Sequence, residues 1–205
     1  TTCPGTVWAG SGVNEAGLAM GGSSCAAKVP RPPEVLSPHL VIRKVLAEAT
    51  TVKEAVAILK EMPVTPWGLN LALVDRHENA AILEKAGALQ GERVSRGEPI
   101  FCANHALTPE LGPFREMTTG QLQESEERFA AMQCLTEAGS MDSQMAKRVA
   151  AYAGRPGALS RYGDDDPLGY ETEYAAVFFC QTSRAEICFS HADRDPWRAF
   201  SLSAC

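Results

Sequence analysis

Apolar residues along this chain follow two different periods, and the change between the periods divides the sequence into blocks of helices and blocks of strands. Helical spacing begins after Ser37-Pro38 and again after Thr51, so residues 37–62 are predicted to form two amphipathic helices. A second helical block is expected from Ser125 to Ala153, with Ser125 as the N-cap of its first helix. Each predicted helix has one apolar face to bury.

Alternating, strand-like segments lie before, between and after these helices. Residues 1–24 are typical of a hairpin, residues 69–102 of an antiparallel meander ending at Ile100 to Cys102, and residues 174–190 of a final hairpin. Helices can then cover both outer faces of two stacked antiparallel sheets. The predicted fold class is therefore α/β, a four-layer αββα sandwich in a single domain over residues 1–205. In this arrangement Thr6 to Met20 stack on the meander, and the helix pairs lie on opposite outer faces.

Composition narrows the picture mainly by exclusion. The net charge is -6, from 25 acidic and 19 basic residues without a basic block, so we expect no nucleic-acid partner. No apolar run approaches the roughly 20 residues that span a bilayer, so we expect no membrane segment. Seven cysteines without a C-x-x-C pair favour a reducing, cytoplasmic location with mostly buried thiols. Cys102 and His105 form only half of a ligand set, so no metal site is expected.

Asn104 and His105 are the residues best suited to catalysis or binding, because they lie where the predicted meander ends. A preorganised asparagine amide can donate to a developing oxyanion, a role worth about 3 kcal/mol. The alternative is that Asn104 caps a turn and His105 is a polar surface residue. Small residues at the end of the second strand let a ligand approach closely, or form a flexible exit loop; these are Gly22, Ser23 and Ser24.

A Gly-, Pro- and Asp-rich loop is predicted for residues 154–169. Its acidic triplet, Asp164 to Asp166, lacks the ligand spacing of an EF-hand, so a solvated turn is expected.

Several motifs together resemble one family. Pro4-Gly5-Thr6 followed by residues 12–19, GVNEAGLA, resembles the "PG…G-x-N-x-x-G-L-A" hairpin of the acyl-coenzyme A:6-aminopenicillanate acyltransferase-like proteins, peptidase family C45 of the N-terminal-nucleophile hydrolases. Further motifs in the family's order are Pro38-His39, Thr51-x-x-Glu54-Ala55, Leu69-Asn70, Leu83-Glu84, Ala103-Asn104-His105 and Ser125-x-x-Arg128. The resemblance covers nearly the whole chain.

The resemblance implies an amidohydrolase or acyltransferase that acts on a small amide or peptide-like substrate through an acyl-enzyme. Asn104 would stabilise the oxyanion, and Gly22, Ser23, Ser24 and His105 would bind the substrate, with no metal or organic cofactor. The family nucleophile is a cysteine freed by autoproteolytic processing, and it lies upstream of the hairpin that begins this chain. The resemblance therefore implies a sandwich that lacks its first strands here, and a companion polypeptide that carries the nucleophile strand. It also predicts an open sheet edge.

Three points stay open. Thr1 is an alternative nucleophile, because a hydroxyl beside a free α-amine can be activated without another base. The chain could instead be a non-catalytic binding subunit. Thr172-Glu173 replaces a Ser-Arg pair of related acyltransferases, which leaves the preferred substrate charge undecided. The sequence also does not determine the oligomeric state, and a homo-oligomer is possible. If Asn104 is catalytic, we expect its side-chain amide to point into the cleft between the two predicted sheets near Ser23, with no protein acceptor for its NH2 group.

Overall fold

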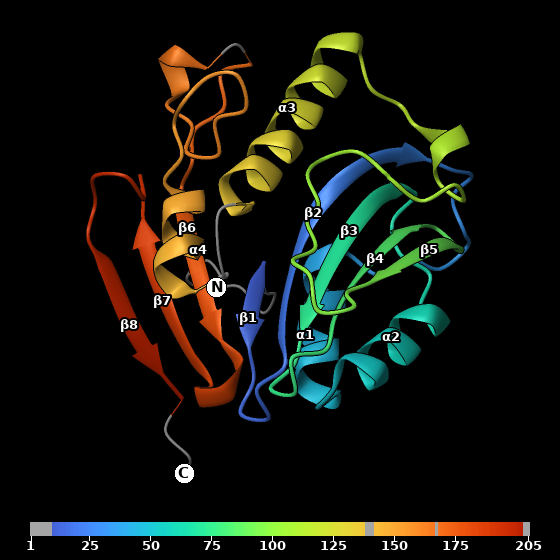
Figure 1. Ribbon diagram of the computed structural model, residues 1–205. Helices are drawn as coiled ribbons and strands as arrows, with labels where there is room; N and C mark the ends of the chain where they lie inside the picture. Colours follow the sequence, from blue (N-terminus) through green and yellow to red (C-terminus); the bar gives the residue numbers. More distant parts are fainter. Residues whose placement is uncertain (1–9, 138–141, 167, 203–205) are drawn as a thin grey trace.

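The computed structural model describes residues 10–137, 142–166 and 168–202 (Figure 1). The strands are β1 Ser11–Val13, β2 Ala19–Lys28, β3 Trp67–Val74, β4 Ala80–Ala86, β5 Leu89–Val94, β6 Tyr174–Phe179, β7 Arg184–Phe189 and β8 Trp197–Ser201. The α-helices are α1 Pro38–Glu48, α2 Val52–Glu61, α3 Thr119–Thr136 and α4 Ser143–Ala150, and short 3₁₀ helices are η1 Gly112–Phe114, η2 Gly163–Asp165 and η3 Cys180–Thr182.

The strands form two antiparallel sheets. The larger sheet has the order β1-β2-β3-β4-β5, and the smaller has the order β6-β7-β8. The prediction that the first hairpin stacks on the meander is therefore wrong, because β2 pairs directly with β3 from Ala19↔Val74 to Lys28↔Trp67. The part of that prediction on Thr6 to Ala9 lies outside the described residues. The smaller sheet contains β8, which the sequence did not indicate.

Helices α1 and α2 cover one face of the larger sheet, and their boundaries agree with the sequence prediction. Ser37 and Thr51 are their N-caps, and each side chain accepts a hydrogen bond from a backbone N–H in the first helical turn. Their apolar stripes meet the alternate residues of β2, β3 and β4 that point to the same side. This buried cluster comprises Leu18, Met20, Val41, Ile42, Val45, Ala49, Val52, Ala55, Val56, Leu59, Met62, Val64, Leu69, Leu71, Leu73, Ala81 and Leu83.

Asn14 and Gly17, in the turn before β2, connect the helix layer with the smaller sheet. The Asn14 side chain donates to the carbonyls of Leu46 and Ala49 at the end of α1 and accepts from the Leu18 N–H. Gly17 has a φ of +81°, and a Cβ atom built on it would lie 2.2 Å from the Cys180 carbonyl oxygen. Only glycine fits this position, so the turn packs directly against η3.

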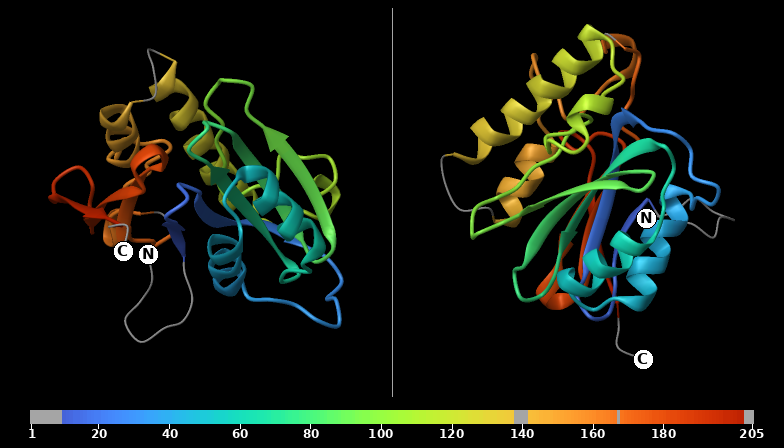
Figure 2. Two further views of the ribbon diagram at one scale, coloured as in Figure 1. Left: turned by 90° about the horizontal axis from the view of Figure 1, so that it is seen from below. Right: turned by 90° about the vertical axis from the view of Figure 1, so that its right-hand side faces the viewer.

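The smaller sheet packs against α4 through the face of β6 and β7 that carries Glu186, which forms an ion pair with Lys147. Helix α4 lies on the opposite side of the molecule from α1 and α2 in both Figure 1 and Figure 2. The edge strands are β1 and β5 in the larger sheet, and β6 and β8 in the smaller one.

Two local predictions around α3 are wrong. Residues 101–107 contain no strand; the segment forms an irregular loop across the face of the larger sheet that α1 and α2 leave uncovered. Helix α3 begins at Thr119, where Thr118 and Gln121 form a capping box, and not at Ser125. Ser125 lies instead inside the helix and is fully buried. The second helix of this pair, α4, begins at Ser143 as predicted and ends three residues earlier than expected.

None of the helices in the described ranges is both long and apolar enough to cross a membrane.

We predict that Gly17→Ala lowers the free energy of unfolding by roughly 1–3 kcal/mol, because an L-residue is strained at this φ and its Cβ would meet the Cys180 carbonyl. Urea denaturation measures the change. Gly120→Ala is the matched control, since a Cβ at Gly120 in α3 meets no atom within 4 Å. An equal response of the two variants would contradict the proposed packing of the turn on η3.

Candidate functional site

A row of polar and small residues crosses the middle of the larger sheet. The strand registers place Ser23 beside Asn70, Asn70 beside Glu84, and Glu84 beside Gly91. These residues point away from the apolar helix layer, because their neighbours Leu69, Leu71 and Leu83 fill that layer. The row therefore forms a polar strip on the face over which residues 101–108 lie.

Side chains of this strip hold the loop of residues 101–108 in place, because that loop has no strand partner of its own. The carbonyl oxygen of Ala103 accepts hydrogen bonds from Ser23 Oγ at 2.7 Å and from Asn70 Nδ2 at 2.9 Å. Glu84 accepts from the backbone N–H groups of Leu107 and Thr108 at 2.8–3.0 Å and from the Thr108 hydroxyl at 2.8 Å. A side chain at Gly91 would overlap Thr108, whose Oγ1 would lie 2.2 Å from the added Cβ.

Asn104 follows Ala103 directly and is held by α3 on its other side. Its backbone N–H donates to Ser125 Oγ at 2.7 Å, and its side-chain Oδ1 accepts from Arg128 at 2.7 Å. Ser125 and Arg128 lie three positions apart, so both project from the same face of the helix. Asn104 thus lies between the sheet and α3, with its backbone and its amide each fixed by a separate bond.

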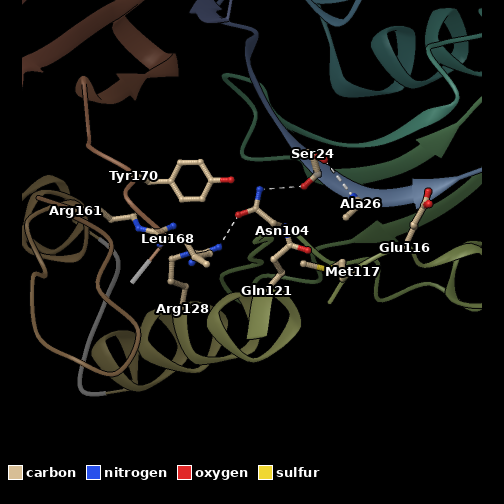
Figure 3. Close-up of a pocket in the computed structure, with 10 residues that line it drawn as sticks. All are labelled: Ser24, Ala26, Asn104, Glu116, Met117, Gln121, Arg128, Arg161, Leu168 and Tyr170. Carbon is tan, nitrogen blue, oxygen red and sulfur yellow. Dashed lines mark hydrogen bonds between the residues drawn. The ribbon is translucent and has the colours of Figure 1, made fainter. Parts of the chain in front are cut away.

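The Arg128 bond also decides which way the Asn104 amide faces. A guanidinium has only donors, so the atom that it contacts must be the amide oxygen. The NH2 group then faces the opposite way and donates to the Ser24 carbonyl oxygen at 3.2 Å (Figure 3). The expectation that the Asn104 NH2 has no protein acceptor is therefore wrong, because one of its two hydrogens binds the Ser24 carbonyl. This bond does not use the second hydrogen.

Asn104 lines a cavity of about 350 Å³ between β2, α3 and the loop that precedes β6. Figure 3 shows the side chains around it, with Tyr170 and Arg161 across from Ser24. The lining residues are Ser24, Ala26, Asn104, Glu116, Met117, Gln121, Arg128, Arg161, Leu168 and Tyr170. Polar and apolar side chains are mixed around the cavity, so it can bind a small molecule by hydrogen bonds and also contact its apolar part.

Asp166 fixes the cavity wall that carries Leu168 and Tyr170. Its side chain is only 1% exposed, pairs with Arg155 and Arg161, and accepts from the Leu168 and Tyr170 N–H groups at 2.9 and 3.1 Å. Burial raises the pKa of the Asp166 carboxyl, but these hydrogen bonds outweigh burial and lower the pKa from 3.8 to about 2. The prediction of a solvated turn is therefore wrong at Asp166.

The structure brings only part of the predicted site together. Ser24 lines the cavity beside Asn104, whereas Ser23 lies beneath the loop and binds Ala103. Gly22 faces the helix layer, where an added Cβ would lie 3.4 Å from Ile42. His105 is 4% exposed, and its Nδ1 lies 2.8 Å from Ser125 Oγ; burial lowers its pKa below 6.5.

No cysteine in the part of the chain that the structure describes is poised as a nucleophile beside Asn104. Burial raises the pKa of the Cys102 thiol, and it raises the pKa of Cys25 to about 12. Ser24 offers a hydroxyl at the cavity, but its Oγ accepts from the Ala26 N–H, and no histidine contacts it in the described residues. Within these same residues, no cluster of three or more histidine, cysteine or acidic side chains could hold a metal ion.

Sequence reasoning missed most of the cavity wall. Arg128 was recognised only as part of a motif, and its i, i+3 relation to Ser125 was the available signal for a shared helix face. Arg161, Leu168 and Tyr170 lie in a loop that reaches Asn104 only through the tertiary fold, so local spacing contained no signal for them.

Comparison with solved structures identifies the class of fold. Penicillin V acylase from Agrobacterium tumefaciens aligns with a TM-score of 0.55 at 19% identity, over 96% of this chain and 67% of the acylase chain. Two variants of the conjugated bile acid hydrolase from Clostridium perfringens each align with a TM-score of 0.54 at 12% identity, over 99% of this chain and 80% of theirs. The chain therefore has the N-terminal-nucleophile hydrolase fold, which confirms the predicted α/β class.

The family follows from the sequence match. The family model for acyl-coenzyme A:6-aminopenicillanic acid acyl-transferase matches residues 3–194, and the chain belongs to this family. Members of the family are amidohydrolases and acyltransferases that act on amide bonds. A comparison with curated proteins gives no match.

We predict that Asp166→Asn lowers stability by roughly 2 kcal/mol at pH 7, as expected from a pKa that is 3.8 when unfolded and about 2 when folded. Because folding depresses this pKa, the contribution is complete above the unfolded value and disappears as pH falls through the folded value. The difference between wild type and variant should therefore be constant above about pH 5 and shrink toward zero near pH 2. Denaturation at several pH values measures it.

Asp164→Asn serves as the control, because Asp164 is exposed in the same loop. A wild-type minus Asp166→Asn difference that stayed constant down to pH 2 would contradict the assignment of Asp166 as the ionised anchor of this wall.

Proposed function

We propose that this chain is the larger part of an amidohydrolase or acyltransferase of the N-terminal-nucleophile type, in which Asn104 donates a hydrogen bond to the oxyanion of the acyl-transfer step. The observation that carries the proposal is the Asn104 amide, which lines the cavity with its orientation fixed by Arg128. A donor that is already oriented loses little free energy to reorganisation when negative charge develops on the substrate oxygen.

The neighbourhood of the amide supports this role. The cation at Arg128 pulls electron density toward Oδ1, which makes the NH2 hydrogens better donors. One hydrogen binds the Ser24 carbonyl, which leaves the other for a substrate oxygen in the cavity. Leu168, Tyr170 and Met117 offer the apolar surface that an acyl group would contact. The volume of about 350 Å³ suits a small amide or peptide-like substrate.

In the proposed reaction, the nucleophile attacks the amide carbon and the carbonyl π electrons move onto the oxygen that Asn104 binds. Collapse of this intermediate expels the amine, which takes the proton released by the nucleophile. Water then gives hydrolysis, or a second amine gives acyl transfer. The nucleophile belongs to a companion polypeptide produced by processing, as the resemblance implies, and its free α-amine acts as the base.

We predict that Asn104→Ala lowers kcat by about a hundredfold or more, as the loss of one oxyanion donor does. The side chain also bonds Ser24 and Arg128, so a stability loss of about 1–2 kcal/mol is expected rather than none. Asn104→Asp is the matched variant, because it keeps the shape and the Arg128 contact but removes the donor. The assay uses the complete protein with penicillin V and a conjugated bile acid among the test amides, the compounds that name two proteins of the same fold.

An Asn104→Asp variant with normal kcat would reject the oxyanion role. Parallel loss of folding and activity in both variants would instead assign Asn104 to the structure of the loop.

Two rival hypotheses concern the nucleophile. In the first, Thr1 is the nucleophile, and Thr1 lies outside the described residues. In the second, the chain is a non-catalytic binding subunit, which the lack of a poised thiol among the described residues also fits. Mass spectrometry of the denatured protein after incubation with substrate distinguishes the proposed function from these two rival hypotheses. We expect a second polypeptide whose first residue gains the acyl mass. An acylated Thr1 supports the first rival, and a single unmodified chain without turnover supports the second.

A further inference from the structure

The loop that carries Asn104 is anchored at both ends by one partly buried ion pair. Glu84, at the centre of β4, is completely buried, and Arg93 on β5 donates to it at 3.1 Å. Arg93 also donates to the Phe101 carbonyl at 2.9 Å, while Glu84 binds the N–H groups of Leu107 and Thr108. The pair thus holds the residues just before and just after Asn104.

We infer that the Glu84–Arg93 pair positions Asn104 for catalysis, although neither side chain lines the cavity. This inference rests on the proposed role of Asn104. Burying a carboxylate without partners costs free energy, so a buried carboxylate is found where donors bind it. Here those bonds substitute for the ladder of a strand, because residues 101–107 have no β partner. Glu84 therefore replaces regular secondary structure as the means of holding this backbone in place.

The chemistry of the contacts requires a carboxylate and not an amide. Every partner of the Glu84 oxygens is a donor: the Leu107 and Thr108 N–H groups, the Thr108 hydroxyl and Arg93 Nε. Glu84→Gln keeps the volume but turns one acceptor into an NH2 group that faces these donors. Some of the bonds must then break, and the loop must shift to relieve the repulsion.

The other side chains that line the cavity do not bind this pair. Arg128 projects from α3, and Leu168 and Tyr170 are fixed by Asp166. Loss of Glu84 should therefore displace the oxyanion donor while the surface that holds the substrate stays in place. A shift of about 1 Å in a catalytic group can cost about a hundredfold in rate.

Glu84→Gln in the complete protein is expected to lower kcat about ten- to a hundredfold with KM changed less than about threefold, measured with the fastest amide from the panel above. In an Asn104→Ala background the same substitution should change kcat less than about twofold, because no donor is left to misplace. A general loss of folding would lower activity in both backgrounds alike, and that result would overturn the inference.

Asp75→Asn is the matched control. Asp75 is a second fully buried carboxylate of the same sheet region, and it binds the N–H groups of Val52 and His77, away from the loop. Its loss should cost stability without changing kcat per folded molecule. If Asp75→Asn and Glu84→Gln reduce kcat equally, the positioning role of Glu84 is rejected.

Hydrogen exchange gives a readout that does not depend on turnover. Glu84→Gln should raise exchange at Leu107 and Thr108 at least tenfold and leave exchange in α1 and α2 unchanged, whereas unchanged protection at these two residues would overturn the inference.

If Glu84→Gln does not fold, Arg93→Lys provides the same test at the Phe101 end, because a lysine cannot bind both Glu84 and the Phe101 carbonyl as the forked guanidinium does. A normal rate in Asn104→Ala would reject the proposed function, while a normal rate in Glu84→Gln alone would reject only the positioning role.

Discussion

The candidate site depends on hydrogen bonds between the face of a β-sheet and a loop that has no regular structure. The polar row of the larger sheet supplies these bonds: Ser23 and Asn70 bind the Ala103 carbonyl, and Glu84 binds the backbone of Leu107 and Thr108. A strand at this position would satisfy its own groups along a ladder, whereas this loop needs partners from the sheet beneath it. The main chain can then expose Asn104 at the turn and still be fixed on either side of it.

Helix α3 holds Asn104 from the side opposite to the sheet. Ser125 accepts a hydrogen bond from the Asn104 N–H and Arg128 donates one to the Asn104 side chain, so one helix face fixes both the backbone and the amide of Asn104. Glu124 pairs with Arg128 and with Arg161, and Arg161 in turn pairs with Asp166. The ionic network therefore connects the oxyanion candidate with the loop that forms the opposite wall. The two sides of the cavity are therefore joined by ion pairs, although much of its lining comes from irregular segments.

Local patterns were enough to predict the parts of the fold that depend on local physics. The period and the N-caps of residues 37–62 predicted α1 and α2, because cap and apolar stripe lie within the same short segment. The pairing of β2 with β3 across about 50 residues could not be derived in this way, since alternation shows a strand but not its neighbour.

The predicted strand at Ile100 to Cys102 failed for a related reason, because Phe101 packs against Phe129 of α3 and its carbonyl accepts from Arg93, so the segment does not join the ladder. Asn104 could be singled out from residue type and motif. The direction of its amide could not, because Arg128 sets it from a helix 24 residues away.

A structure of the complete protein with a bound tetrahedral analogue of an amide would test the oxyanion role of Asn104 most directly. If Asn104 has this role, the analogue's oxyanion lies about 2.7–3.1 Å from Asn104 Nδ2, with Oδ1 still bound to Arg128. An oxyanion bound by other donors, with the Asn104 amide turned away or out of reach, would contradict it.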